Sequence, residues 1–194
     1  MSERTLDTVS LAFLSEVLQS YVPKTLGGER LKPAAVLVPI QSIEGKEHLI
    51  LTQRQQSLNS HGGEIAFPGG AIDPADAGPL DTALRESQEE IGLHPRDVKV
   101  LGQLDQVTTS STHLVTPFVG LIPFPYDFCL NKAETEAVFS VPISALLEAE
   151  CFYVEIGNGH PRPIDHFRHE GYDIWGATAR IIKQLLELAY GFTA

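Results

Sequence analysis

The sequence predicts a layered α/β fold, and three observations lead to this prediction. Short apolar runs rich in β-branched residues alternate with amphipathic segments of helical period, and helical segments stand before, between and after the strands. The 194 residues show no repeat, low-complexity tract or inter-domain linker. We therefore expect one domain over 1–194, in which residues 1–30 form a helix and its lead-in.

The first half of the chain predicts one helix, a hairpin and a long loop before a second helix. Apolar residues recur at helical spacing over 6–20, and Pro23 follows. We expect strands at 34–40 and 48–53, joined across Glu44-Gly45. Residues 54–80 are rich in Gly and Pro, which marks a shaped and functional loop. Asp81 is the expected N-cap of a helix that Gly92 ends.

The second half predicts further strands and a closing helix. Strands are expected over 98–107, 114–122 and 137–141, and Pro142 fits the first turn of a short helix through Glu148. Residues 151–156 and 166–169 are expected to pair as a late hairpin. Residues 174–188 carry Ile181, Leu185 and Leu188 on one helical face.

Charge and composition exclude several classes of protein. The formal net charge is −11, and so acidic a surface repels the phosphates of nucleic acid. Cys129 and Cys151 show no CxxC spacing, and a reducing compartment is the default expectation. No signal peptide and no apolar run of membrane-spanning length is evident. We expect a cytoplasmic protein that binds neither nucleic acid nor a membrane, and a homodimer is left open.

The helix over 81–92 gathers three carboxylates on one side. At about 100° per residue, Glu86 and Glu90 lie roughly 40° apart, and Glu89 lies roughly 60° from Glu86 on the other side. Such like charges destabilise an isolated helix by ~0.2–0.5 kcal/mol per pair. Hard divalent cations, Mg²⁺ or Mn²⁺, match oxygen ligands of this kind. Arg85 can pair with Glu89 at i,i+4; the alternative is a solvated acidic face.

The loop before this helix favours the metal interpretation. Pro68-Gly69-Gly70 permits a ligand to approach the backbone closely, and a glycine carbonyl can supply a further oxygen. Glu64 precedes this turn and is a fourth available carboxylate. The spacing of a P-loop is absent, and that of an EF-hand fits poorly.

These residues carry a resemblance to a known family. Residues 70–93, GAIDPADAGPLDTALRESQEEIGL, resemble the Nudix box, Gly-x5-Glu-x7-Arg-Glu-U-x-Glu-Glu-x-Gly-U with U aliphatic. The match departs in three places: Asp76 stands for the first Glu, the spacing to Arg85 is one residue longer, and Ser87 takes an aliphatic position. The resemblance implies a Nudix-like α/β/α sandwich with a mixed central sheet.

A second stretch resembles one branch of this family. Residues 51–54, with Leu58, His61, Gly63-Glu64, residues 67–70 and Asp73, look like the upstream motif of the coenzyme A pyrophosphatases. Gln55 stands where that motif has Ser. Residues 115–120 and 174–179 also look like this branch, so the resemblance runs from about 33 to 190.

The resemblance implies a function and a set of roles. The expected reaction is metal-dependent hydrolysis of the diphosphate of coenzyme A or a derivative, giving 3',5'-ADP and 4'-phosphopantetheine or its acyl form. Glu86 and Glu90 would be the primary ligands of Mg²⁺ or Mn²⁺, with Glu89, Glu64 and the Gly70 carbonyl assisting. Two such cations would offset four carboxylates beside a diphosphate. The general base is left open among Glu89, Glu64 and Glu134, and Arg85 would position Glu89.

Other assignments keep their alternatives. Arg54 contacts the substrate phosphates together with the Gly69-Gly70 turn, or it only lies along a strand end. His160, Arg162, His166, Arg168 and His169 receive a 3'-phosphate or form a solvated hairpin. Phe118 and Trp175 are expected in the core rather than against adenine. ADP-ribose, NADH or a dinucleoside polyphosphate are alternative substrates, and a nucleotide-sensing module without activity is the alternative from another class.

Overall fold

The longest described strand, β1 (Lys32–Ile43), organises the central sheet of this computed structural model. The structure describes residues 10–27, 31–57, 62–110, 112–156 and 163–193. β1 runs parallel to β7 (His113–Leu121) over nine residue pairs, from Lys32↔His113 to Ile40↔Leu121. All other pairings in this sheet are antiparallel, so the central sheet is mixed, as the sequence predicts.

The remaining strands of the central sheet attach to β1, β2 or β7. The strand order across the sheet is β3-β2-β1-β7-β5; in addition, β4 pairs with β1, β6 with β7 and β8 with β2. Their bounds are β2 Lys46–Arg54, β3 Ile65–Ala66, β4 Gly69–Ala71, β5 Lys99–Gln103, β6 Val107–Thr108 and β8 Thr135–Pro142.

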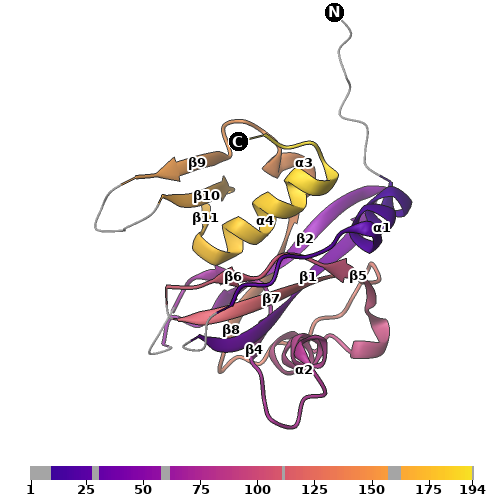
Figure 1. The fold of residues 1–194 in the computed structure, drawn as a ribbon, viewed down its shortest axis with the longest axis vertical. Coiled ribbons are helices and arrows are strands. Elements are labelled where there is room, and N and C mark those ends of the chain that lie inside the picture. Colours follow the sequence, from indigo (N-terminus) through magenta and orange to yellow (C-terminus); the bar gives the residue numbers. More distant parts are fainter. Residues whose placement is uncertain (1–9, 28–30, 58–61, 111, 157–162, 194) are drawn as a thin grey trace, which may run out of the picture.

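Helices cover both faces of this sheet (Figure 1). α2 (Pro79–Ile91) packs on one face, where Ala83 and Ile91 join Ala35, Leu37 and other buried residues. α1 (Leu11–Ser20) and α4 (Gly176–Ala189) pack on the other face in a second and larger hydrophobic cluster. The layers are therefore those of an α/β/α sandwich, and two separate cores lie on the two sides of one sheet.

β1 and β2 pair only near their connecting turn and then separate. The two strands pair from Ile43↔Lys46 to Ile40↔Leu49, next to the predicted Glu44-Gly45 turn. Beyond that point β4 takes the place beside β1, in the register Ala34↔Ala71 to Val36↔Gly69. β8 pairs with β2 from His48↔Pro142 to Arg54↔Thr135, and β3 pairs with β2 near its end, at Thr52 and Gln53. This divergence brings the Gly69-Gly70 turn, the end of β2 and the start of β8 to one place.

A second, three-stranded sheet follows the central one. β9 (Phe152–Glu155), β10 (Ile164–His169) and β11 (Tyr172–Trp175) are antiparallel in the order β11-β10-β9. Phe167 and Ile174 are fully buried in the same cluster as the apolar face of α4. This small sheet therefore belongs to the larger core and lies to the left of α4 in Figure 1.

Several element predictions are wrong in detail. Residues 6–9 lie outside the described part, and the first helix starts after Ser10, whose hydroxyl accepts the Phe13 N–H. The long loop contains β3 and β4, which are too short to show a period. The predicted strand 98–107 is a 3₁₀ turn (Pro95–Asp97) followed by β5 and β6. Ile174 ends up in β11 rather than α4.

Asp81 is not the N-cap of α2. Gly78 holds that position and Pro79 begins the helix, because a proline needs no hydrogen-bond partner for its nitrogen in the first turn. Asp81 lies inside the first turn, where its carboxylate accepts the Ala77 N–H at 3.0 Å. At the other end, Gly92 adopts φ +71° and closes the helix as predicted.

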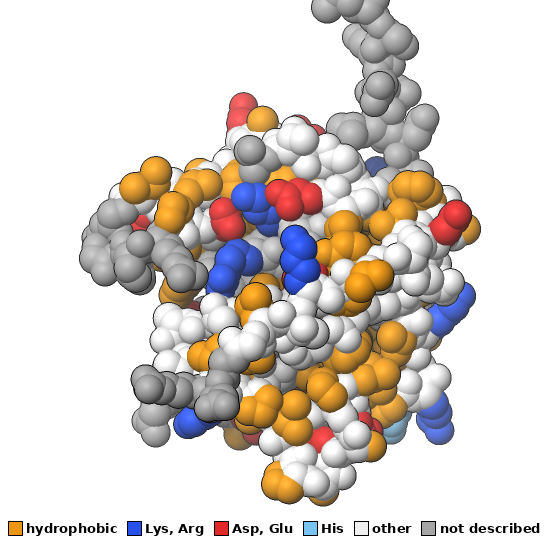
Figure 2. All heavy atoms as spheres, viewed as in Figure 1, with side chains coloured by type: hydrophobic (Ala, Val, Ile, Leu, Met, Phe, Trp, Pro, Cys, Tyr) orange, Lys and Arg blue, Asp and Glu red, His pale blue; other side chains and the backbone are white. Residues whose placement is uncertain are grey.

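Two surface observations complete the description. Acidic and basic side chains are intermixed over α4 on the face shown in Figure 2, with Lys183 lying 3.7 Å from Asp165 and 4.0 Å from Glu187. Among the described residues, no helix has the length and apolar character needed to cross a membrane.

The contact between β4 and β1 leads to a first prediction. A Cβ on Gly69 would lie 2.3 Å from the Ala35 carbonyl oxygen and 2.6 Å from Val36 Cα, both of them backbone atoms. We expect Gly69→Ala to lower the free energy of unfolding by at least ~2 kcal/mol. Gly27→Ala, where a Cβ meets nothing within 4 Å, is the control for chemical denaturation. Equal stability of the two variants would contradict this account.

Candidate active site

The three carboxylates of α2 differ sharply in their burial. Glu90 is 5% exposed, the Glu86 side chain is 17% exposed and that of Glu89 is 57% exposed. Leu84 and Ile91 pack on the sheet side of the helix, as its period predicts. The acidic face is therefore not simply solvated, because one of its carboxylates lies almost wholly inside the protein.

The glycine pair lies directly against these carboxylates. The Gly69 N–H donates to Glu90 Oε2 at 3.3 Å. A Cβ on Gly70 would lie 2.5–2.7 Å from the carboxyl atoms of Glu86. Gly69 and Gly70 thus let the backbone of β4 approach α2 closely, and Glu86 and Glu90 meet this short segment side by side.

Arg85 holds the outer carboxylates in place. Its Nη1 lies 2.9 Å from Glu86 Oε1 and 3.0 Å from Glu89 Oε2, so the predicted i,i+4 pair is present. Its Nε and Nη2 donate to the two oxygens of Asp76 at 2.8 and 3.0 Å. Asp76 also accepts the hydroxyl of Thr82 at 2.7 Å. Asp76, which departs from the Nudix pattern, therefore fixes Arg85.

Arg54 enters the site from the end of β2. Its Nη1 lies 3.7 Å from Glu90 Oε1, and its buried Nε has no hydrogen-bond partner among the described residues. A guanidinium held in this way can bind a phosphate oxygen. This arrangement favours the phosphate-contact alternative for Arg54 over a purely structural one.

Main-chain bonds tie Glu64 and Glu134 to the same strand end. The Arg54 N–H donates to the Glu64 carbonyl at 3.0 Å, and the Gln55 N–H donates to the Glu134 carbonyl at 2.8 Å. The Glu134 side chain accepts from Asn131 Nδ2 at 3.2 Å. Four separate parts of the sequence, around residues 54, 64, 86–90 and 134, therefore converge. Leu58 and His61 of the upstream motif lie outside the described residues.

Burial and mutual repulsion raise the pKa values of the inner carboxylates. Burial raises the pKa of Glu90 to about 7, against the opposing effect of Arg54 and the Gly69 N–H, and Glu86 and Glu134 raise it further. Burial also raises the pKa of Glu86; Arg85 opposes this shift, and Glu89 and Glu134 add to it. The negative charges of Glu86, Glu90 and Glu134 thus act on one another, so an added cation would relieve a real electrostatic cost.

The oxygen atoms available in this site are of the kind that bind a hard divalent cation. Carboxylate oxygens from Glu86 and Glu90, beside a glycine backbone, are ligands that Mg²⁺ and Mn²⁺ prefer. In the described part of the chain, no group of three or more His, Cys, Asp or Glu is already gathered closely enough to hold a metal. Arg85 accounts for part of this, because it pairs with both Glu86 and Glu89.

The basic segment near the C-terminus is not a free phosphate site. His166 is 6% exposed and lies between Asp173 and Glu155, at 3.0 and 3.5 Å. Arg168 Nε lies 4.0 Å from Asp173, and His169 lies 4.0 Å from Glu170. His160 and Arg162 fall outside the described residues. Each of the described basic side chains of this segment therefore lies beside a carboxylate, and those next to His166 and Arg168 come from the neighbouring strands β9 and β11, which the sequence could not show.

The two aromatic residues expected in the core differ. Phe118 is 9% exposed and packs on the α2 side of the sheet, as predicted. Trp175 is only partly buried and lines a pocket of the second sheet, so the core prediction is wrong for it. Trp175 is the last residue of β11 and directly precedes α4, and its side chain lines that pocket.

Comparisons with known proteins agree with this fold and site. The NUDIX domain model matches residues 31–151. The chain is 40% identical over 167 residues to the uncharacterized Nudix hydrolase NudL of Photorhabdus laumondii, covering 85% of this chain and 88% of that protein. It is 39% identical to the NudL protein of Citrobacter koseri, over 82% of this chain and 85% of that one.

A solved structure shares the fold. A Caenorhabditis elegans Ap4A hydrolase in a binary complex superposes with a TM-score of 0.50 at 21% identity, over 57% of this chain and 80% of that one. An α/β/α sandwich that presents an acidic helix to a glycine turn defines the class, a hydrolase of diphosphate-linked nucleotides. The chain belongs to the Nudix family and is a Nudix pyrophosphohydrolase.

The burial of Glu90 generates a prediction about stability. Because the folded-state pKa exceeds that of an unfolded glutamate, metal-free protein should lose about 3 kcal/mol as the pH rises from ~4.5 to above 7. Glu90→Gln removes the charge, so the metal-free variant should become more stable than wild type at pH 8 but not at pH 4. Urea unfolding at both pH values in chelator measures this difference. Glu89→Gln, at an exposed carboxylate, is the control; an equal gain there would refute the assignment.

The ion pair between Asp76 and Arg85 leads to a prediction about the pH dependence of stability. Hydrogen bonds from Arg85 and Thr82 hold the pKa of Asp76 well below its usual range. The stabilisation is therefore present above the usual carboxyl pKa and is lost as the pH falls far below it. We expect Asp76→Asn to lower the melting temperature at pH 7, and the difference from wild type to shrink at strongly acidic pH. A difference that does not change with pH would mean that Asp76 acts through packing alone.

Proposed function

We propose that this Nudix pyrophosphohydrolase cleaves the diphosphate of coenzyme A or its acyl derivatives, giving 3',5'-ADP and 4'-phosphopantetheine or its acyl form. The observation that carries the proposal is the position of Arg54. This residue belongs to the upstream stretch that resembles the coenzyme A branch, and its guanidinium lies beside the buried Glu90. An upstream motif that only built the fold would not need a half-buried cation with an unsatisfied Nε there.

The chain's own residues divide the work of the reaction. Arg54 would bind a phosphate oxygen of the substrate, and the Gly69-Gly70 segment would let the diphosphate approach α2 without side-chain obstruction. Arg85, anchored on Asp76, would position Glu86 and Glu89. These contacts fix the anhydride against the acidic helix, which is the positioning that hydrolysis needs.

A divalent cation, Mg²⁺ or Mn²⁺, would be held by Glu86 and Glu90, with Glu89 and the Gly70 carbonyl as further oxygen donors. When bound, such an ion polarises a phosphoryl oxygen and lowers the pKa of water. Glu86 and Glu90 carry the raised pKa values expected of carboxylates that are matched only when a cation arrives.

Water adds across the P–O–P anhydride in this reaction. The water oxygen bonds to one phosphorus, the bridging oxygen leaves with the other, and a carboxylate takes the proton. Among Glu64, Glu89 and Glu134, we favour Glu134 as the base. It acts electrostatically on both Glu86 and Glu90, whereas Arg85 engages Glu89. Glu64, whose backbone supports Arg54, is the second choice.

A substrate panel tests the proposal. With Mg²⁺ or Mn²⁺, we expect kcat/KM for coenzyme A to exceed that for ADP-ribose, NADH and diadenosine tetraphosphate by at least ~10-fold, since Arg54 belongs to the branch-like motif. Product analysis should give 3',5'-ADP. Arg54→Lys should raise KM because the planar fork is lost, and Glu90→Gln should abolish turnover while the circular dichroism spectrum is unchanged. A clear preference for ADP-ribose or another nucleotide would overturn the coenzyme A assignment.

A further inference from the structure

A groove near the β1–β2 turn has no part in the chemistry proposed above. Its volume is about 330 Å³, and eight of its ten lining residues are apolar or aromatic. The other two, Gln41 and Ser140, are neutral. Gln41 is 3% exposed, and its Nε2 already donates to the Pro123 carbonyl at 2.6 Å. This apolar groove therefore suits hydrocarbon better than a charged or strongly hydrated group.

Strand register places the floor of the apolar groove on the face of the sheet that α2 covers. Ile50 of β2 lies opposite Ser140 of β8, and Thr52 lies opposite Val138, so these side chains share one face. Ile50 is 1% exposed and belongs to the hydrophobic cluster beneath α2, against which Val138 also packs. The apolar groove is thus an extension of this core that stays open at the surface.

Aromatic residues of the connection between β7 and β8 form the wall of the apolar groove. The rings of Tyr126 and Phe128 pack with centroids 5.2 Å apart. The Tyr126 hydroxyl donates to Asp97 at 3.0 Å, so its polar end is bound outside the groove lining. Phe124 is 52% exposed and also lines the groove. A ligand in the groove would therefore contact rings rather than hydroxyl groups.

The same connection leads from the apolar groove to the candidate active site. Beyond the aromatic wall, the Cys129 N–H donates to the Ile91 carbonyl at 3.0 Å, and the Asn131 N–H donates to the Glu90 carbonyl at 2.9 Å. The chain then reaches Glu134, the favoured base. One segment thus passes from the groove, around the C-terminal end of α2, to the acidic cluster.

The separation of the groove from Arg54 matches one arm of the proposed substrate. Ile50 and Arg54 are four residues apart on β2, which corresponds to ~13 Å along an extended strand. A pantetheine arm has about 13 bonds between its phosphorus and its sulfur, and it extends to ~15 Å. The adenosine end, in which one ribose joins the base to the diphosphate, is shorter. The sulfur of coenzyme A, and any group attached to it, can therefore reach the apolar groove.

Charge also decides which end of the substrate the groove suits. The 3'-phosphate of coenzyme A lies on the ribose that carries adenine, and a phosphate needs cationic or N–H partners. None of the described residues that line the groove is Lys, Arg or His, and the formal net charge of the chain is −11. The groove therefore disfavours the adenosine end, whereas an aliphatic chain is stabilised by burial there.

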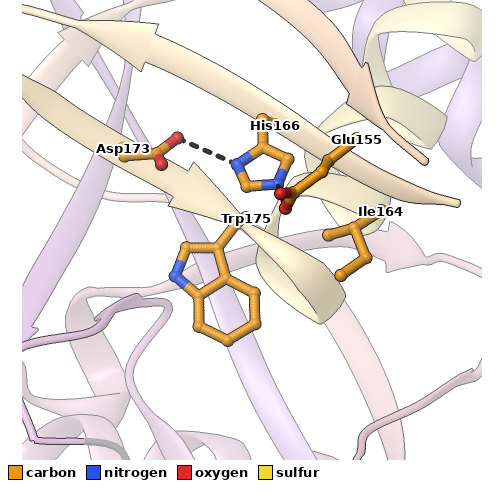
Figure 3. Close-up of a pocket in the computed structure, with 5 residues that line it drawn as sticks. All are labelled: Glu155, Ile164, His166, Asp173 and Trp175. Atoms are coloured by element: carbon orange, nitrogen blue, oxygen red, sulfur yellow. Dashed lines mark hydrogen bonds and ion pairs between the residues drawn. The ribbon is translucent and has the colours of Figure 1, made fainter. Parts of the chain in front are cut away.

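The pocket of the second sheet offers no comparable surface. Figure 3 shows Asp173 and Glu155 on opposite edges of the His166 ring, at 3.0 and 3.5 Å from its two nitrogens. Three titratable side chains thus pair with one another inside that pocket. Charged groups of this kind repel an aliphatic chain, so this pocket does not compete with the apolar groove for one.

We propose that the apolar groove binds the acyl chain of a coenzyme A thioester, with the pantetheine arm following the β7–β8 connection back to the diphosphate. Thioesters with a medium-length aliphatic chain are then better substrates than free coenzyme A. The identity of the linking arm rests on the proposed function. The uncharged and aromatic character of the groove does not depend on it.

Calorimetric titration with acetyl- and hexanoyl-coenzyme A tests the proposal, with a chelator present so that neither is hydrolysed. Full burial of a methylene strengthens binding by about fourfold, and an open groove that gains half of this free energy gives roughly twofold. The hexanoyl chain has four more methylenes than the acetyl group. We expect it to bind at least ~10-fold more tightly.

Two variants locate this preference in the apolar groove. Phe124→Ala removes part of the wall and should reduce the hexanoyl-to-acetyl affinity ratio to about threefold or less. Ser140→Trp places a bulky ring on the floor and should reduce the ratio to about one. Phe13→Ala is the matched control, because Phe13 is a similarly exposed phenylalanine of α1 outside the groove, and it should keep the full ratio.

Turnover gives a second measurement. With Mg²⁺ or Mn²⁺, KM should be at least ~10-fold lower for hexanoyl- than for acetyl-coenzyme A, and kcat should agree within twofold, because the acyl chain lies far from the reacting atoms. Phe124→Ala and Ser140→Trp should remove this difference in KM.

The outcomes separate this inference from the proposed function. If both thioesters bind equally, or if both groove variants keep the wild-type ratio, the acyl assignment is wrong even when coenzyme A is hydrolysed. If Phe124→Ala instead converts a dimer to a monomer in sedimentation and leaves the ratio unchanged, the groove belongs to a second copy of the chain. If the hexanoyl preference is present and depends on the groove but no thioester is hydrolysed, the proposed function fails and the groove assignment stands.

Discussion

The close approach of a side-chain-free backbone to α2 is the constraint on which the site depends. Gly69 fits against β1 where a Cβ would touch the Ala35 carbonyl, and Gly70 leaves room for the Glu86 carboxyl. Only this fit lets the acidic helix lie on β4 with Glu90 beside the Gly69 N–H. The carboxylates therefore owe their positions to the missing side chains opposite them as much as to the helical period that groups them.

The two arginines of the site differ in how well they are satisfied, although their side chains are equally exposed. Arg85 donates to both oxygens of Asp76 at 2.8 and 3.0 Å, and also to Glu86 and Glu89. Arg54 lies 3.7 Å from Glu90, and its Nε has no hydrogen-bond partner among the described residues. A fully bonded Arg85 beside an incompletely satisfied Arg54 is the arrangement that a site prepared for a charged ligand requires.

Much of the fold and part of the site could be predicted from the sequence. Helical period placed Glu86, Glu89 and Glu90 together, and Gly92 marked the end of α2, because both signals are local. The burial of Glu90, the Asp76–Arg85 pair and the strands β3 and β4 could not be predicted, since each depends on contacts between distant or very short segments. The pocket around His166 was missed for the same reason: its carboxylates come from β9 and β11.

The second sheet begins at Phe152, one residue after the part of the chain that matches the common family domain. The acidic helix, the glycine pair and Arg54 all lie within that common part, whereas Glu155, His166 and Trp175 lie after it. Among the described residues, none after 151 belongs to the hydrophobic cluster under the acidic helix. Sequence change in the second sheet therefore leaves the packing that supports the acidic helix in place.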